Sequence, residues 1–252
     1  MKTVRIIPKL EVKNENLIKG VHLDGLRIVG KPEVAALKYA KNGADELIYI
    51  DLVASLYKRD NWIKIIKRTA NQIYIPLTVG GGIRSIEDAK IFLRAGADKV
   101  AINTGIVNQP KLISQVAKKF GSQCMVALIE VQKKIDGSYE VYTDSGRTPT
   151  DLEPVSWAKK VIKLGAGEIL LTFIHQDGTN KGYDIKLLKQ IAGAVNVPVI
   201  ASGGAGRLED FVKAVINGQA DALAIASMLH FNKTNIKEIK KYLNKNGVRV
   251  RL

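Results

Sequence analysis

Three consecutive glycines, Gly80 to Gly82, stand where a short apolar segment meets an amphipathic one in IPLTVGGGIRSIEDAKIFLRAGADKVAINT, residues 75–104. Ser85 is followed three residues later by Asp88, a spacing typical of a capping box at the start of a helix. The free N–H groups and the dipole of a helix N-terminus favour an anion such as phosphate. The stretch therefore predicts a βαβ unit with a phosphate site at its glycines.

The same pattern returns in VPVIASGGAGRLEDFVKAVINGQADALAIAS, residues 197–227. Pro76 corresponds to Pro198, and Gly43 of GADELIYIDL corresponds to Gly165 of GAGEILLTFI, both at a separation of 122 residues. Two independent matches at one spacing indicate an internal repeat. We therefore expect a single domain, residues 1–252, built from two similar halves at about 1–122 and 123–252.

The composition favours one domain with a large core, because 46% of the 252 residues are hydrophobic. No apolar run reaches the ~20 residues of a membrane span, and the first residues lack a signal-peptide core. The lone Cys124, which we place in an apolar strand, has no disulfide partner. We expect a cytoplasmic protein without a membrane or nucleic-acid partner, whose net charge of +15 suits phosphorylated ligands or an acidic protein.

Short apolar segments alternate with helical patterns, as in buried parallel strands joined by helices. The expected strands are 4–12, 46–50, 73–79, 99–103, 125–130, 168–173, 197–201 and 222–226. The expected helices are 32–42, 62–71, 86–95, 111–120, 155–164, 185–194, 208–217 and 236–246. Eight such units predict an α/β fold, a (β/α)8 TIM barrel with a two-fold half-barrel repeat. A doubly wound sheet is the competitor, but it needs no such repeat.

Two connections are longer than the others. Residues 131–146 contain an Asp136-Gly137 turn between two alternating runs, which predicts a β-hairpin inserted after the fifth strand. Residues 14–31 form a long first loop with three glycines. Both would lie at the catalytic end of a barrel, and each is a candidate lid.

Eight motifs in order, VKN…LIKG, DELIYIDLVAS, PLTVGGGIRSIEDA, GADKVAINT, FGSQ, GAGEILLT, DGTNKGYD and ASGGAG, together resemble the HisF family over essentially the whole chain. HisF proteins are the cyclase subunits of imidazole glycerol phosphate synthase, a glutamine amidotransferase. The resemblance implies a barrel docked through its amino-terminal face onto a HisH-like glutaminase. Ammonia made there passes along the barrel to a bisphosphorylated aminoimidazole carboxamide ribotide, which is cleaved and cyclised. We expect no cofactor and no metal.

The resemblance also implies the residues that hold the substrate. One phosphate is expected on Gly81, Gly82, Asn103 and Thr104, and the other on Gly203, Gly204, Ala226 and Ser227. The internal repeat supports this, because two matched sites suit a substrate with two phosphates. Further polar positions that match the family and would contact or orient the substrate are Lys19, Asp51, Thr78, Gln123, Thr172 and Asp177.

The catalytic pair departs from the family, which uses an aspartate after strand one as general acid and another after strand five as general base. Glu11 and Glu130 stand at these positions, so each carboxylate is kept but is one methylene longer. Carboxyl groups in unlike environments can still divide the two roles. Their reach matters, because a displacement of about 1 Å can cost roughly a hundredfold in rate.

Lys9 stands where the family usually has cysteine. Strand alternation places Lys9 on the same face as Glu11, toward the barrel interior. Because a buried lysine is costly unless paired, we predict an ion pair of Lys9 with Glu11 or Glu130, which would narrow the ammonia route. The first loop also differs, with Ile28 and Lys31 where the family has aspartates.

A charged ring is expected at the barrel floor, since residues at the starts of strands one, two, four and six match the family's ammonia gate. These residues are Arg5, Glu46, Lys99 and Glu168. Four charges of alternating sign predict a mutually paired cluster. The alternative is a salt-bridge cluster with a purely structural role.

The departures at positions 9, 11 and 130 lead us to expect a HisF-like paralogue with altered or lost cyclase activity. It would receive ammonia from a HisH-like glutaminase and serve surface-sugar amidation with an N-acetyl sugar amidotransferase. The alternative is the ordinary ammonia-dependent cyclase, a lyase of histidine biosynthesis. Weaker hypotheses are a non-catalytic scaffold and the isomerase HisA, whose family does not need the charged floor ring.

Overall fold

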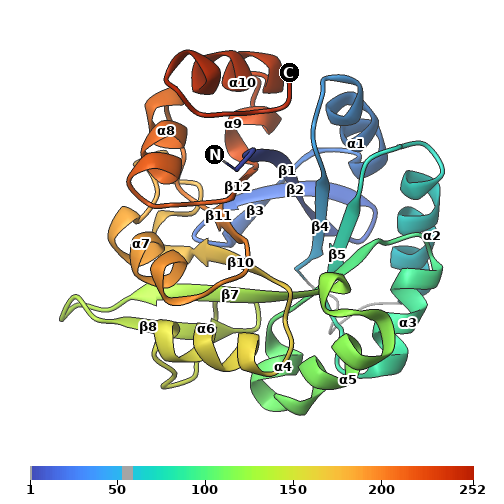
Figure 1. The fold of residues 1–252 in the computed structure, drawn as a ribbon. Helices are drawn as coiled ribbons and strands as arrows, with labels where there is room; N and C mark the ends of the chain where they lie inside the picture. Colours follow the sequence, from blue (N-terminus) through green and yellow to red (C-terminus); the bar gives the residue numbers. More distant parts are fainter. Residues whose placement is uncertain (1, 53–58) are drawn as a thin grey trace.

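The computed structural model describes residues 2–52 and 59–252, in which parallel strands close into a barrel (Figure 1). In pairing order the barrel strands are β1 (Arg5–Lys13), β4 (Leu47–Asp51), β5 (Leu77–Gly80), β6 (Lys99–Ile102), β7 (Met125–Lys133), β10 (Glu168–Phe173), β11 (Val199–Ser202) and β12 (Ala222–Ile225). β12 pairs with β1 and closes the ring, and the neighbouring strands of the ring are parallel. The predicted TIM barrel is therefore confirmed.

Helices surround the ring and cover its outer face (Figure 1). They are α1 (Pro32–Lys41), α2 (Arg59–Ala70), α3 (Ile86–Arg94), α5 (Lys111–Phe120), α6 (Pro154–Lys163), α7 (Ile185–Ala194), α8 (Leu208–Ile216) and α10 (Ile236–Lys245). Local sequence sets their starts: Ser85 and Asp88 form the predicted capping box of α3, and Asp184 caps α7. Because capping side chains satisfy N–H groups that have no partner within the helix, they fix where it begins.

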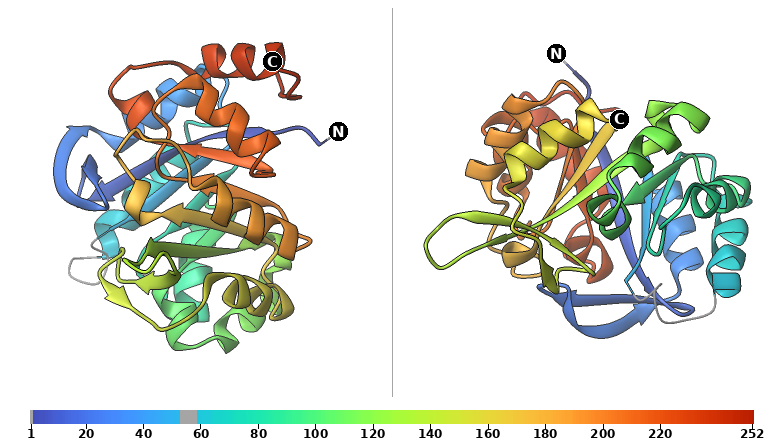
Figure 2. Two further views of the ribbon diagram at one scale, coloured as in Figure 1. Left: turned by 90° about the vertical axis from the view of Figure 1, so that its left-hand side faces the viewer. Right: turned by 90° about the horizontal axis from the view of Figure 1, so that it is seen from below.

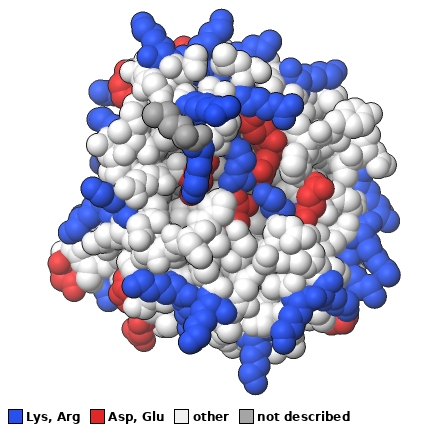
Figure 3. Space-filling view, in the orientation of Figure 1, with Lys and Arg blue, Asp and Glu red and all other residues white. Residues whose placement is uncertain are grey.

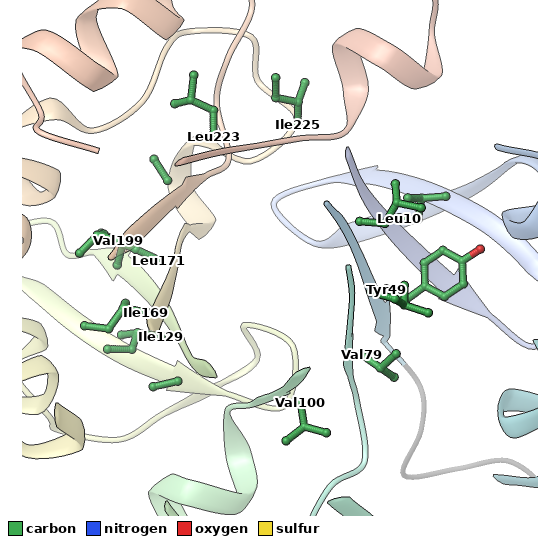
Figure 4. Packing of buried hydrophobic residues seen from close by; sticks show 14 of the residues in the cluster. Leu10, Tyr49, Val79, Val100, Ile129, Ile169, Leu171, Val199, Leu223 and Ile225 are labelled. Atoms are coloured by element: carbon green, nitrogen blue, oxygen red, sulfur yellow. The ribbon is translucent and has the colours of Figure 1, made fainter. Parts of the chain in front are cut away.

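The core consists of two apolar layers on either side of the strands. Side chains that point outward, among them Leu10, Tyr49 and Val79, pack beneath the helices (Figure 4). Alternate side chains point inward and form a second buried cluster that includes Ile7, Ile48, Ile50, Ala101, Val126, Leu128, Leu170, Ile200, Ala222 and Ala224. The barrel is thus filled with side chains over most of its depth.

Two β-hairpins lie at the end of the barrel where the strands finish, on the opposite side from the N-terminus (Figure 2). The hairpin predicted after the fifth strand is confirmed: β7 runs on into antiparallel pairing with β8 (Tyr139–Thr143), which β9 (Thr148–Pro149) follows. The first connection is not a loop but a second hairpin. β2 (Asn16–Val21) pairs antiparallel with the end of β1 and with β3 (Asp24–Gly30).

Other departures from the predicted pattern are small. Cys124 lies in the 3₁₀ turn η1 (Ser122–Cys124) and not in a strand, because β7 begins only at Met125. β5 and β11 begin later than predicted, and α2 begins earlier. Short helices that the pattern did not indicate follow β6 and β12, namely α4 (Thr104–Asn108) and α9 (Ser227–His230). Among the described helices, none is long and apolar enough to span a membrane.

Candidate active site at the carboxyl ends of the strands

A pocket of about 100 Å³ opens beside the first glycine motif, after β5 and β6. Gly81 has φ +103°, and a Cβ there would lie 2.4 Å from the backbone oxygen of Asp51, so only glycine fits. The lining includes the residues predicted for the first phosphate, which are Gly81, Gly82, Asn103 and Thr104. Asp51 and Glu130 line the same pocket. Backbone N–H groups and small polar side chains make it suitable for an anion.

Arg84 and Arg147 also line this first pocket, and sequence reasoning missed them. Both are exposed, and neither makes an ion pair with a described residue. Arg84 directly follows the glycine motif and Arg147 follows the inserted hairpin, so their positions in the sequence were the available signal. Two free guanidinium groups beside the glycines favour phosphate binding, since arginine presents two parallel donors to such an anion.

A smaller pocket of about 20 Å³ lies beside the second glycine motif, after β11 and β12. Gly204 has φ +114°, and a Cβ there would lie 2.1 Å from the backbone oxygen of Gly182. The lining includes the residues predicted for the second phosphate, which are Gly203, Gly204, Ala226 and Ser227. Asp177 and Ser202 line the pocket as well. Since β5–β6 and β11–β12 stand across the ring from each other, the two pockets occupy equivalent places in the two halves.

Glu11 is fully buried at the barrel mouth between two lysines. Nζ of Lys9 lies 3.0 Å from Oε1 of Glu11, and Nζ of Lys19 lies 2.8 Å from Oε2. The predicted inward ion pair of Lys9 is therefore confirmed, with Glu11 as the partner. Burial alone would raise the pKa of Glu11, but the ammonium groups of Lys19 and Lys9 outweigh it and lower this pKa to about 2.

Glu130 faces the same interior from β7 but has no ion-pair partner among the described residues. The backbone N–H of Gly146 donates to its carboxyl group, and Oε2 has no hydrogen-bond partner in the described part of the chain. Burial raises the pKa of Glu130 to about 7, although the nearby charge of Lys9 opposes the shift. The two glutamates therefore hold unlike protonation states near neutral pH.

Lys19 lies on β2 and is buried, rather than on an open loop. Its Nζ donates to Glu11 and, at 2.6 Å, to Oδ2 of Asp177. The two carboxylates outweigh the effect of burial and raise the pKa of Lys19. Lys19 therefore ties the first hairpin to β1 and to the segment that follows β10.

The other predicted polar residues occupy different depths. Thr172 is buried on β10 beside Glu130 in the strand register, and its hydroxyl has no hydrogen-bond partner. Thr78 is buried on β5 at the level of Lys99, near the opposite end of the barrel, and lines neither phosphate pocket. Gln123 lies in η1, exposed, ahead of β7. A direct contact of Thr78 or Gln123 with substrate at the glycine motifs finds no support in this geometry.

The four charged residues predicted at the floor do form a closed ring. Arg5 contacts Glu46 at 2.7 Å and Glu168 at 2.5 Å, and Lys99 contacts the same two carboxylates at 3.0 and 2.9 Å. Seen from the end where the strands begin, charges of both signs gather in a central hollow, and Lys and Arg side chains surround the rim (Figure 3). The apolar interior cluster separates this ring from Glu11 and Glu130.

Among the described residues, no group of three or more His, Cys, Asp or Glu is arranged to hold a metal ion. The partly buried His230 joins the short helix after β12 to β1. Its Nε2 lies 3.1 Å from the backbone oxygen of Lys9, and its Nδ1 lies 2.7 Å from the hydroxyl of Tyr39. Burial lowers the pKa of His230 to about 4, so that Nε2–H donates to the carbonyl and Nδ1 accepts from Tyr39.

The fold and the repeated glycine motifs define a (β/α)8 protein with one glycine-lined pocket in each half of the barrel. Residues 5–235 match the model of a family described as histidine biosynthesis protein. The chain is 56% identical over 211 residues to the imidazole glycerol phosphate synthase subunit HisF of Legionella pneumophila. The aligned residues are 84% of this chain and all of the relative. It is 46% identical over 251 residues to the subunit of the same name from Alkaliphilus metalliredigens (strain QYMF), which covers both chains completely.

The chain therefore belongs to the histidine biosynthesis protein family, among its HisF members. Both relatives carry the synthase name, so the comparisons favour the ordinary cyclase over the paralogue that we expected from Glu11 and Glu130. They lend no support to altered activity.

Proposed function

We propose that this chain is the cyclase subunit of an imidazole glycerol phosphate synthase. It uses ammonia to cleave and cyclise a bisphosphorylated aminoimidazole carboxamide ribotide. The observation that carries the proposal is the pair of glycine-lined pockets, one in each half of the barrel, with the unpaired carboxyl group of Glu130 lining the larger one. A substrate with a phosphate at each end would span the barrel mouth and present its middle to this carboxyl group.

Substrate binding divides between the two pockets. In the first, the backbone at Gly81 and Gly82, the side chains of Asn103 and Thr104, and the arginines 84 and 147 would hold one phosphate. In the second, the backbone at Gly203 and Gly204 and the residues that begin α9 would hold the other. Fixing both ends of a flexible ribotide orients its reacting carbon, which is a large part of catalysis.

The partner in this proposal is a HisH-like glutaminase on the face where the strands begin. The ring of Arg5, Glu46, Lys99 and Glu168 lies at that end, and the apolar interior above it includes the small side chains Ala101, Ala222 and Ala224. Ammonia is small and neutral, so an apolar path lined by small residues suits it better than a charged one. The four charges would act as the gate at the entrance.

The test is ammonia-dependent turnover of the ribotide by the isolated chain, with both products quantified by chromatography. We expect turnover by the natural sequence, a loss of at least about 100-fold in Glu130→Gln, and no change in the exposed control Glu15→Gln. If the natural chain is inactive but the Glu11→Asp, Glu130→Asp double variant turns over, the longer side chains have abolished the reaction. Inactivity of both would contradict the proposal and point to another acceptor.

A further inference from the structure

The buried charges at the barrel mouth form a chain of alternating sign. Lys9, Glu11, Lys19 and Asp177 follow one another with contacts of 3.0, 2.8 and 2.6 Å. Their side chains are at most 5% exposed. Each oxygen of Glu11 therefore faces an ammonium group that water does not reach. Protonating Glu11 would leave the Lys9 ammonium without an ion-pair partner among the described residues and Lys19 with Asp177 alone, which is unfavourable in a low-dielectric site.

Glu130 stands in the opposite situation. It is buried as deeply, but its carboxyl group receives one backbone N–H, from Gly146, and Oε2 faces the interior without a partner. A carboxyl group without a cation partner is more stable there in its neutral form. Oε2 is thus available to carry a proton and to pass it on.

The two groups also differ in their access to substrate. Glu130 lines the first phosphate pocket, whereas Glu11 lines neither of the two. Both oxygens of Glu11 lie in ion pairs with lysines, although Oε1 makes no hydrogen bond within the part of the chain that the structure describes. Of these two glutamates, Glu130 is the one that lines the pocket and whose carboxyl group makes no ion pair with a described residue.

We propose that in this chain Glu130 alone carries the proton transfer of the C–N cleavage step, and that Lys9 is a positioning residue that keeps Glu11 as a permanent carboxylate. This inference rests on the proposed function. It departs from the family pattern, which assigns the acid to the carboxyl group on strand one and the base to the one on strand five. The departure follows from Lys9, which adds a second ammonium group to the carboxylate that Lys19 already contacts.

The C–N cleavage step balances with one carboxyl group. As ammonia bonds to the carbon and the C–N bond to the leaving nitrogen breaks, the electron pair goes to that nitrogen, and Glu130 gives the nitrogen its proton from Oε2. The carboxylate that results takes a proton from the nitrogen that came from ammonia. In this step Glu130 thereby returns to its starting state, and Glu11 neither gains nor loses a proton.

Other titratable and charged groups near Glu11 and Glu130 also influence the pKa values of these two carboxyl groups. Glu11 is faced by His230 from α9, which is neutral near pH 7, besides the two lysines and Asp177. Glu130 is influenced by Lys9, which favours ionisation, and by Glu11 and Asp177, which oppose it. The remaining charged side chains that line its pocket are Asp51, Arg84, Asp144 and Arg147.

The first experiment follows the glutamate carboxyl carbons by ¹³C NMR over pH 4 to 9, in the full chain labelled at glutamate. Glu11→Gln and Glu130→Gln assign the two signals. We expect Glu130 to titrate near pH 7 and Glu11 to remain ionised down to pH 4. In Lys9→Met we expect the midpoint of Glu11 to rise by about one unit or more, and in the exposed control Lys237→Met to stay unchanged. A Glu11 midpoint above about 5 in the natural chain would overturn the inference.

The second experiment measures kcat against pH with free ammonia held constant. If Glu130 must start protonated, kcat falls as the pH rises through about 7, and Lys9→Met moves this limb to higher pH. If Glu130 starts as the base, kcat rises through the same range, and the inference is wrong. Titration as expected without any turnover would instead overturn the proposed function, and the proton-transfer role with it.

Discussion

Gly204→Ala tests whether the second glycine motif holds a substrate phosphate. Gly204 has φ +114°, and its added Cβ would lie 2.1 Å from the backbone oxygen of Gly182 and 2.8 Å from the carbonyl carbon. Ordinary contact begins at 3.4 Å, so the two segments must separate by roughly 1.3 Å. Gly204 itself lines the pocket of about 20 Å³, and the atoms that its Cβ would meet are backbone atoms of Gly182, so the displacement moves the proposed phosphate site.

The expected loss follows from two costs. A non-glycine residue at this φ stores about 1–3 kcal/mol of strain, which a urea titration would detect as a lower unfolding midpoint. A displacement of about 1 Å at a positioning site costs roughly 100-fold in rate, so kcat/KM for the ribotide should fall by about that factor. The loss should appear in both KM and kcat, because the phosphate contact binds the ribotide and also orients its reacting carbon.

Gly193→Ala is the matched control, because Gly193 lies near the end of α7 with no atom within 4 Å of an added Cβ. Its kcat/KM should equal that of the natural chain, and its stability should be unchanged or higher, since alanine favours a helix by roughly 0.5–1 kcal/mol over glycine. A folded Gly204→Ala variant with kcat/KM within about threefold of the natural value would show that this pocket does not hold substrate.

Three further outcomes follow from the buried polar groups. Because the pKa of Glu130 is about 7 in the folded chain and 4.5 in the unfolded chain, the unfolded chain loses the Glu130 proton first as the pH rises. The free energy of unfolding should therefore fall by about 3 kcal/mol between pH 4.5 and a pH above 7. In Glu130→Gln the denaturant midpoint should not show this dependence on pH. Lys99→Met should lower the stability by roughly 1–3 kcal/mol, since it leaves the two floor glutamates with one cation, and an unchanged urea midpoint would mean that the ring adds no net stability. His230→Phe should lower the free energy of unfolding by roughly 1–3 kcal/mol, because the carbonyl of Lys9 and the hydroxyl of Tyr39 lose their hydrogen-bond partner. A thermal unfolding midpoint equal to that of the natural chain would show that water replaces the histidine.

The sequence pattern predicted one hairpin and missed the other for a reason that lies in their turns. Asp136-Gly137 is a familiar hairpin turn, and Gly137 adopts φ +82° at little cost. The turn between β2 and β3 has His22 and Leu23 at φ +54° and +61°. Leucine rarely adopts positive φ, and the Asp24-Gly25 dipeptide that follows lies at the start of β3 rather than in the turn, so the local sequence did not place this turn correctly.

Tertiary contacts hold the unusual turn in place. The backbone N–H of His22 donates to the carbonyl of Asp177, and Lys19 on β2 contacts both Asp177 and Glu11. Contacts between residues so distant in the sequence leave no local pattern. The barrel strands, in contrast, are short apolar runs in a regular repeat, which is why their order was predictable.

The candidate site shows the same limit. Alternation along β1 was enough to place Lys9 inside the barrel, because residues two apart on a strand share a face. It did not decide between Glu11 and Glu130, since that choice depends on the relative reach of side chains from β1 and from β7 across the ring. The arginines at 84 and 147 were missed for a similar reason: only the folded hairpin brings the second of them to the first glycine motif.

The charges inside the described barrel explain why Glu130 is the group left to titrate. The floor ring pairs two cations with two carboxylates and is neutral as a unit. At the mouth, Lys9 and Lys19 balance Glu11 and Asp177, so this set is neutral as well. An ionised Glu130 would therefore be a surplus negative charge in an interior that the apolar cluster fills, and a surplus charge there favours protonation. Lys9 supplies the second positive charge that makes the set of four charges at the barrel mouth neutral. As a result Glu11 stays ionised, whereas Glu130 is the carboxyl group that titrates.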